Sequence, residues 1–276
     1  MTRFKSLLFI AVLLGFAALA HAGFNDGKAA YDRGDYAKAY KEFKPLADHG
    51  HAEAQYILGV MCHDGRGVRQ DFAKAVKWYG KAAEQGFSPA QRELGMMYEY
   101  GEGVPKDYAE AVKWVRKAAE QGDDEAQFEL GRAYVDGNSV PQGYAEAVKW
   151  FRKAAEQGFP PAQRELGGLY ANGQGVPQDY AEAVNWFRKA AEQGDDEAQF
   201  ELGWAYADGN SVPQDFVQAY MWFYLAAAHK DDTYAEDYAE DFIDSLAEKM
   251  TPAQLAEAQR LAKEWKPKRR DQGFRF

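Results

Sequence analysis

The residue types that bind zinc gather once in the sequence, at His49, His51, Cys62 and His63. Zinc sites use cysteines and histidines in closely spaced pairs, usually with four ligands in total. The spacing here matches no such motif, and no second cysteine completes a set because the chain has only one. We therefore expect neither a metal site nor another cofactor. Since other repeats carry tyrosine at its position, Cys62 is expected to be a buried apolar residue.

Acidic clusters are the next candidates for chemistry, because paired carboxylates can act as acid and base. The sequence Asp-Asp-Glu occurs at 123–125 and again at 195–197. Acidic residues are favoured in the first turn of a helix by its dipole, so both clusters are expected to begin helices. The Asp-Gly-Asn segments at 136–138 and 208–210 resemble the start of a calcium loop, but alanine stands where that loop needs a bidentate glutamate. We expect these segments to be turns and the chain to have no catalytic residue.

The N-terminus has the layout of a secretory signal peptide. Arg3 and Lys5 precede an uncharged apolar run from Leu7 to Ala20, and Ala20-His21-Ala22 provides an A-x-A cleavage site. The apolar run is shorter than the roughly 20 residues that span a bilayer, which disfavours a retained membrane anchor. We expect residues 1–22 to be removed and the mature protein to be periplasmic or secreted.

The chain is acidic, with 33 Lys and Arg against 43 Asp and Glu and a formal net charge of −10. A field of this sign repels phosphate backbones and anionic lipid surfaces. We therefore expect no nucleic-acid partner and no stable membrane insertion after signal cleavage.

A period of 36 residues runs through most of the chain, and it is carried by glutamine, glycine and tryptophan. The three series are Gln55, Gln91, Gln127, Gln163 and Gln199; Gly59, Gly95, Gly131, Gly167 and Gly203; and Trp78, Trp114, Trp150, Trp186 and Trp222. Such self-similarity indicates stacked structural repeats. Residues 116–131 and 188–203 are also identical, which indicates that a pair of repeats was duplicated.

Each repeat is expected to contain two helices joined by a turn. In the third repeat, apolar spacing predicts one helix from about Asp124 to Val135 and an amphipathic one from about Tyr144 to Gln157. The segment 136–141, with Gly, Asn and Pro, separates them. A glycine inside a helix costs about 1 kcal/mol relative to alanine, so the Gly series suggests a close approach of two backbones. The Trp series is expected to pack between repeats, with a ligand-facing aromatic ladder as the alternative.

The ends of the array are expected to be caps. Thr251-Pro252-Ala253-Gln254 is typical of a capping box that opens a helix to about Trp265. The full division is a signal peptide at 1–22, a degenerate first repeat at 23–50, repeats at 51–86, 87–122, 123–158, 159–194 and 195–230, capping helices at 231–265, and a basic flexible tail at 266–276.

The repeat reads most clearly in the second copy, and its pattern resembles the Sel-1-like repeat, a relative of the tetratricopeptide repeat. The matching residues are Ala90, Gln91, Leu94, Gly95, Tyr98, Gly101, Gly103, Val104, Pro105, Asp107, Tyr108, Ala111, Val112, Trp114, Lys117, Ala118, Ala119 and Gly122. The resemblance covers about residues 24–230. It implies an all-α, right-handed α/α superhelical solenoid of helix–turn–helix repeats, whose first helices line the concave side.

The resemblance also implies a non-catalytic protein–protein interaction scaffold or adaptor of the cell envelope or secreted fraction. Some cysteine-rich members of the family are described as binding or hydrolysing β-lactams, and an exported hydrolase of that kind is the alternative. This sequence lacks their paired cysteines, and none of its serines begins an S-x-x-K motif.

A candidate binding groove follows from helix geometry, because positions i, i+4 and i+7 of each first helix share the face opposite the buried stripe. The residues on that face vary between repeats, and those we assign to the groove are Tyr56, Val60, His63, Arg92, Met96, Glu99, Phe128, Arg132, Val135, Arg164, Phe200 and Trp204. Arginine and aromatic residues dominate binding energy at interfaces. We predict a protein or peptide partner with apolar anchors and some acidic residues; random drift of a solvated surface is the alternative.

Overall fold

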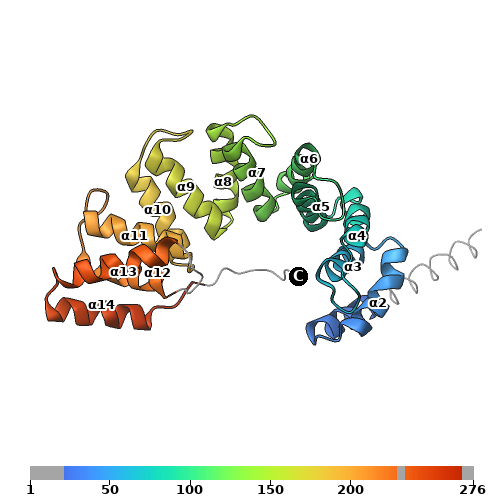
Figure 1. Ribbon diagram of the computed structural model, residues 1–276, viewed down its shortest axis with the longest axis horizontal. Helices are drawn as coiled ribbons and strands as arrows, with labels where there is room; N and C mark the ends of the chain where they lie inside the picture. Colours follow the sequence, from blue (N-terminus) through green and yellow to red (C-terminus); the bar gives the residue numbers. More distant parts are fainter. Residues whose placement is uncertain (1–21, 229–233, 269–276) are drawn as a thin grey trace, which may run out of the picture. The chain divides into compact units, whose positions relative to one another are not determined.

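The computed structural model describes residues 22–228 and 234–268, which form helices connected by turns (Figure 1). Residues 22–32 are helical and precede the helices labelled in the figure. These are α2 (Tyr36–Asp48), α3 (Ala52–Asp64), α4 (Phe72–Glu84), α5 (Ser88–Tyr100), α6 (Tyr108–Glu120), α7 (Asp124–Asp136), α8 (Tyr144–Glu156), α9 (Pro160–Asn172), α10 (Tyr180–Ala191), α11 (Asp196–Asp208), α12 (Phe216–Ala227), α13 (Tyr234–Ala247) and α14 (Pro252–Glu264). The predicted all-α repeat solenoid is confirmed, since consecutive helices pack against each other.

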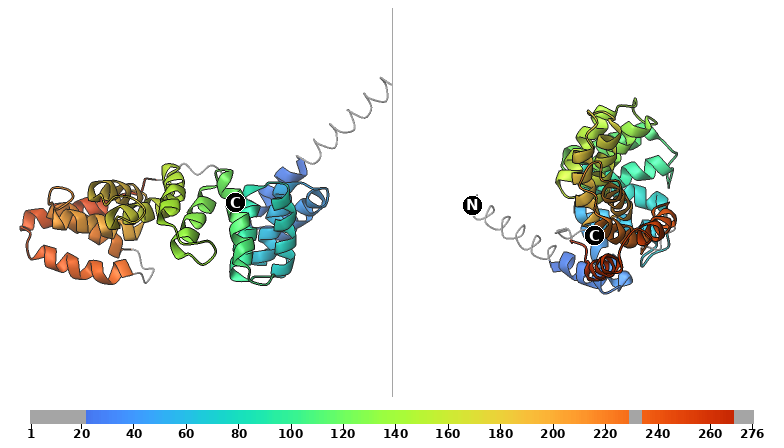
Figure 2. Two further views of the ribbon diagram at one scale, coloured as in Figure 1. Left: turned by 90° about the horizontal axis from the view of Figure 1, so that it is seen from above. Right: turned by 90° about the vertical axis from the view of Figure 1, so that its left-hand side faces the viewer.

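The contacts divide the chain into two compact parts, one ending at Ala126 and the other beginning at Gln127. In the N-terminal part, each helix from α2 to α5 packs against the next. In the C-terminal part, α8 to α12 do the same, and α12 also contacts both α13 and α14 (Figure 2). Among the described residues, none of the helices combines the length and apolar composition that crossing a bilayer requires.

The helices of the third repeat lie within one residue of their predicted bounds, at Asp124–Asp136 and Tyr144–Glu156. The predicted capping box is also present, because Thr251 and Gln254 exchange hydrogen bonds at the start of α14. The signal peptide lies outside the described residues, apart from Ala22. In the basic tail, the Lys268 N–H donates to the Glu192 carbonyl at 2.7 Å, which ties the first tail residues to the end of α10. Residues 269–276 lie outside the described residues.

The glycine in each first helix makes room for a side chain of the second helix. A Cβ added to Gly131 would come within 2.6 Å of the Phe151 ring, which is fully buried. Three other repeats place a ring over their glycine in the same way, from Tyr79, Phe187 and Phe223. At Gly95 the opposing side chain is Val115. The added Cβ would also lie 3.0 Å from the Ala111 carbonyl oxygen there, and at Gly167 it would lie 3.2 Å from that of Ala183. The expected close approach of two backbones is therefore seen at these two glycines, and the nearest obstacle in four of the five repeats is a ring.

The Trp series packs between repeats, as expected. Trp186 is only 7% exposed and belongs to the same cluster as Ala147 and Phe151 of the preceding repeat. In four repeats, the lysine three residues later lies over the ring at about 4 Å from its centroid, which forms a cation–π contact. The partners are Lys81 with Trp78, Lys117 with Trp114, Lys153 with Trp150 and Lys189 with Trp186.

The Gln series supplies a polar tie between neighbouring repeats. The Gln163 amide donates to the Ala155 carbonyl of the preceding repeat at 3.0 Å, and its oxygen accepts from Gln193 at 2.9 Å. Gln91 makes the same two bonds with Ala83 and Gln121. Because a buried polar group costs free energy when it is left unpaired, this arrangement explains how glutamine is tolerated in the core.

Candidate functional site

The predicted groove residues, together with their equivalents Gly168, Ala171 and Ala207, are grouped into three rows according to their position on the first helix of each repeat. The first row is Tyr56, Arg92, Phe128, Arg164 and Phe200; the second is Val60, Met96, Arg132, Gly168 and Trp204; the third is His63, Glu99, Val135, Ala171 and Ala207. The structure gives each row a different environment, so the rows are described separately.

In odd-numbered repeats, the first row consists of aromatic rings that pack into the core. The Phe128 ring lies 5.6 Å from Phe151 in its own repeat and 5.3 Å from Phe159 at the start of the next. Tyr56 and Phe200 are buried, at 5% and 7% exposed, and contact rings in the same manner. These rings join repeats and are largely withdrawn from the surface.

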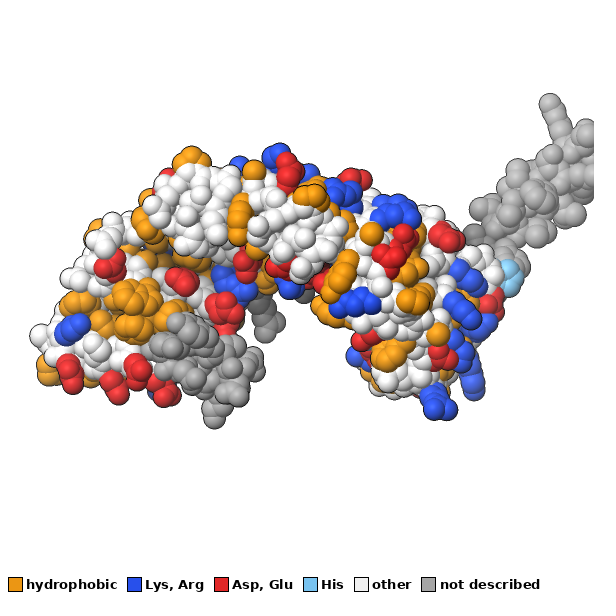
Figure 3. Space-filling view, turned by 45° about the horizontal axis from the view of Figure 1, so that its top comes forward, with side chains coloured by type: hydrophobic (Ala, Val, Ile, Leu, Met, Phe, Trp, Pro, Cys, Tyr) orange, Lys and Arg blue, Asp and Glu red, His pale blue; other side chains and the backbone are white. Residues whose placement is uncertain are grey.

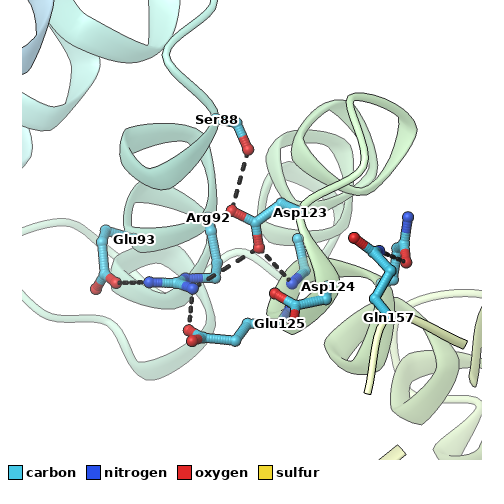
Figure 4. Close-up of polar contacts among 9 residues, drawn as sticks. Ser88, Arg92, Glu93, Asp123, Asp124, Glu125 and Gln157 are labelled. Carbon is cyan, nitrogen blue, oxygen red and sulfur yellow. Dashed lines mark hydrogen bonds and ion pairs between the residues drawn. The ribbon is translucent and has the colours of Figure 1, made fainter. Parts of the chain in front are cut away.

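In even-numbered repeats, the first row is an arginine held by carboxylates. Arg92 pairs with Glu93 at 2.8 Å, lies 3.7 Å from Asp123 and also pairs with Glu125 (Figure 4). Asp123 is fixed in turn, because it accepts from the Ser88 hydroxyl at 3.0 Å. Asp123 and Glu125 belong to the acidic cluster at 123–125, so this cluster is paired with Arg92.

Arg164 repeats this arrangement with Glu165, Asp195 and Glu197, at 3.4, 3.6 and 3.2 Å. Burial alone would lower the pKa of Arg92 and of Arg164, but the surrounding carboxylates raise it overall. The positive charge of each arginine is already balanced by neighbouring carboxylates, which leaves little attraction for an acidic partner.

The residue type in the first row therefore alternates from repeat to repeat, together with the type of the residue that begins the next repeat. Tyr56 and Phe128 meet Phe87 and Phe159, which precede α5 and α9 without a side-chain cap, and we call these aromatic junctions. Arg92 and Arg164 meet Asp123 and Asp195, whose carboxylates also accept a backbone N–H of the following helix, and we call these ionic junctions. The two kinds of junction alternate with the same 72-residue period as the duplicated blocks.

The second row faces outward. Arg132 has a side chain that is 48% exposed, and Trp204 is 42% exposed. A Cβ added to Gly168 would meet nothing within 4 Å, whereas Val60 and Met96 are half-buried. Of the three rows, this one has the side chains most accessible to a partner.

Trp204 borders an open pocket of about 420 Å³ in the C-terminal part of the chain. Apolar residues of α10 and α11, including Val184, Phe187 and Phe200, line it together with the carboxylates of Glu201 and Asp208. No Lys or Arg is among the lining residues. Hydrophobic side chains also gather on one face of this part of the chain (orange, lower left in Figure 3).

The third row contains one side chain that links two repeats. The His63 ring contacts Asp64 at 2.8 Å and Glu102, in the next turn region, at 3.3 Å. Partial burial alone would lower the pKa of His63, but the hydrogen bonds and charges of the two carboxylates outweigh it, so the pKa is raised. Glu99 and Val135 are half-buried.

His63 should make stability depend on pH. Because folding raises its pKa, its contribution is fully present below about 6.5, the pKa of an unfolded histidine, and is lost as pH rises through the folded-state value. We expect His63→Gln to reduce the free energy of unfolding more at about pH 5.5 than at about pH 8.5. Urea denaturation at the two pH values measures this, and equal losses would contradict it. Glu102→Gln should lower the pKa of His63 in an NMR titration.

Side chains that could bind a metal ion or act as a nucleophile do not gather into a site among the described residues. Among the described residues, no three side chains of His, Cys, Asp or Glu lie close enough together to hold a metal ion. Cys62 is buried, as expected, and burial raises the pKa of its thiol. A buried thiol with a raised pKa is a poor nucleophile, because the thiolate is the reactive form.

A comparison with protein-family models finds five Sel1 repeats, at residues 52–87, 88–123, 124–159, 160–195 and 196–231. The chain is also similar to a Sel1 repeat protein from Oxalobacter formigenes, with 33% identity, a TM-score of 0.75, and coverage of 87% of this chain and 99% of that one. A comparison with curated proteins gives no significant match.

A second similar structure is that of a protective antigen present in uropathogenic Escherichia coli strains, which displays an SLR fold. Identity is 37%, the TM-score is 0.78, and the match covers 89% of this chain but only 53% of that one, so this chain spans about half the length of that protein. Sel1 repeat proteins are generally protein–protein interaction scaffolds. With its five repeats and these two structural relatives, the chain belongs to the Sel1 repeat family.

Proposed function

We propose that this chain is a non-catalytic scaffold, exported to the periplasm or beyond, that binds a protein partner through the second row of its first helices. One observation carries the proposal. The duplicated blocks 116–131 and 188–203 are identical, yet the next residue is Arg132 in one and Trp204 in the other. Both side chains are exposed, so the preceding 16 residues have been kept unchanged while the outward-facing residue has changed.

The chemistry of the second row also supports binding. Arginine and tryptophan are enriched among the residues that dominate protein interfaces, and large apolar side chains are uncommon on a surface that only contacts water. Within each compact part of the chain, stacked first helices present such residues one repeat apart, which suits a peptide or a helix of another protein.

Export rests on the signal-peptide layout of residues 1–22. The similar Escherichia coli protein is described as a protective antigen. That description supports an exported location for this chain as well.

The proposal is tested by capturing a partner from the envelope fraction of the source cells with the chain from Gly23 onward. A variant carrying Val60→Ser, Met96→Ser, Arg132→Ser and Trp204→Ser should bind the captured protein at least tenfold more weakly, which corresponds to about 1.4 kcal/mol. The matched control carries Lys113→Ser and Lys149→Ser on the second helices and should bind normally. A partner that is lost only with the control variant would contradict the proposal.

A further inference from the structure

The two duplicated blocks differ in how one glutamate is compensated. In the third repeat, Glu129 pairs with Arg132 at 3.5 Å, one helical turn away. In the fifth repeat, the equivalent glutamate is Glu201, and Trp204 stands at the position of that arginine. Among the described residues, the Glu201 side chain has no hydrogen-bond partner and no ion pair. A cation present in one copy is thus missing from the other.

The surroundings of Glu201 make this absence significant. Glu201 is exposed, but the atoms around its carboxyl partly desolvate it and so raise its pKa, and the nearby negative charge of Glu197 raises the pKa further. Glu197 itself already pairs with Arg164 in the ionic junction. A carboxylate that is partly removed from water and has no positive neighbour is stabilised by any cation that reaches it.

Glu201 also lines the pocket beside Trp204, where the other walls are mostly apolar. Asp208 adds a second carboxylate to the lining, and it accepts a hydrogen bond from Asn210. The Trp204 ring packs on one side against Phe242, with ring centroids 5.0 Å apart, and remains 42% exposed. The pocket therefore combines an apolar floor, a fixed aromatic ring and an acidic rim.

We infer that this pocket binds a basic segment of the partner protein, in which an arginine or lysine pairs with Glu201 and stacks on Trp204. That cation takes the place that Arg132 occupies in the third repeat, and an aromatic or aliphatic neighbour enters the apolar pocket. An acidic segment would be repelled by Glu201 and Asp208. The inference rests on the proposed function and specifies the chemistry of the partner. It takes the place of the acidic partner that the sequence predicts from Arg92, Arg132 and Arg164.

The inference is tested with two fluorescein-labelled peptides of matched length, GRFARLARG and GEFAELAEG, in a fluorescence anisotropy titration against the chain from Gly23 onward. The basic peptide should bind, the acidic one should not, and binding should weaken as salt is raised. Glu201→Gln and Trp204→Ala should each reduce the affinity at least tenfold. The same substitution in the third repeat, Glu129→Gln, provides the matched control and should leave the affinity unchanged.

The inference is overturned if Glu201→Gln binds the basic peptide as tightly as the parent does, or if the two peptides bind equally. Circular dichroism melts of the variants should match that of the parent, because both side chains are exposed. If a captured partner depends on the other second-row residues but not on Glu201 or Trp204, the inference fails while the proposed function stands.

A further arm identifies the source of the basic segment, since residues 266–276 of this chain also contain five Lys and Arg and two Phe. A chain that ends at Lys268 should bind the basic peptide with the same affinity as the longer chain. If the shortened chain binds at least tenfold more tightly, residues 269–276 compete for the pocket, and the assignment to a partner protein is overturned.

Discussion

Phe151→Ala should lower the free energy of unfolding by about 3–5 kcal/mol, the usual loss when a fully buried phenylalanine is truncated in a core. The ring is 0% exposed, and it lies against Gly131 of α7, where no side chain is available to fill the space. The cavity would therefore lie between the two helices of a repeat, at the contact on which their pairing depends. Urea denaturation followed by circular dichroism measures the loss.

Tyr180→Ala is the control, because this ring is 55% exposed and its removal should change stability by less than about 0.5 kcal/mol. A loss for Phe151→Ala no larger than for Tyr180→Ala would show that the ring does not hold the helix pair together. Gly131→Ala should itself cost about 1–3 kcal/mol, since its methyl group would overlap the ring. The double variant should lose less stability than the sum of the two single losses. The Gly131→Ala methyl group no longer overlaps a ring once Phe151 is alanine, and it partly fills the cavity that Phe151→Ala leaves.

The second large effect is expected at the ionic junction. Arg92→Ala should lower the free energy of unfolding by about 2 kcal/mol, which is less than the ~3–5 kcal/mol lost when one partner of a fully buried pair is removed. The side chain of Arg92 is 14% exposed and that of Asp123 is 10% exposed, so their charges are poorly hydrated. Glu125 is 35% exposed, and its contact with water reduces the loss.

Arg132→Ala is the matched control for Arg92→Ala. Its side chain is 48% exposed and has one ion pair at 3.5 Å, and exposed pairs contribute about 0–1 kcal/mol. The two variants therefore separate an arginine that joins repeats from an arginine that faces outward. Equal urea midpoints for both variants would show that the ionic junction contributes nothing to stability.

Periodicity predicted the local structure of this chain well, because helix bounds depend on residues close in sequence. The apolar spacing around Leu130 and the capping signals at Thr251 and Gln254 gave helices within one or two residues of those observed. The position of a neighbouring repeat is not encoded in one helix alone. Helix geometry placed Phe128 and Arg132 on one broad face, but stacking buries part of that face and leaves the rest in water.

A signal that distinguishes the rows is nevertheless present in the sequence. Tyr56 and Phe128 occur with phenylalanine at 87 and 159, whereas Arg92 and Arg164 occur with aspartate at 123 and 195. Residue types that change together between repeats indicate contact, just as covarying positions do between proteins. Comparing the first row with the first residue of the next repeat would have identified the junctions.

The same comparison would not have predicted the unpaired state of Glu201. Its partner in the third repeat is an arginine on the same helix, so the pair can be read from spacing, but the desolvation of Glu201 in the pocket depends on how α10 and α11 pack. The acidic character of the pocket therefore required the structure.

The alternation of junctions limits how an array of this kind can change its length. Loss of residues 87–122 would bring Tyr56 against Asp123, an aromatic ring against a carboxylate that has lost its arginine. Loss of residues 87–158 would bring Tyr56 against Phe159, which reproduces an aromatic junction. Single-repeat insertions and deletions thus create a mismatched boundary, while those of paired repeats do not. The two-repeat segment is therefore the unit that can be duplicated or lost without a mismatched boundary. Related arrays should differ from one another by even numbers of repeats.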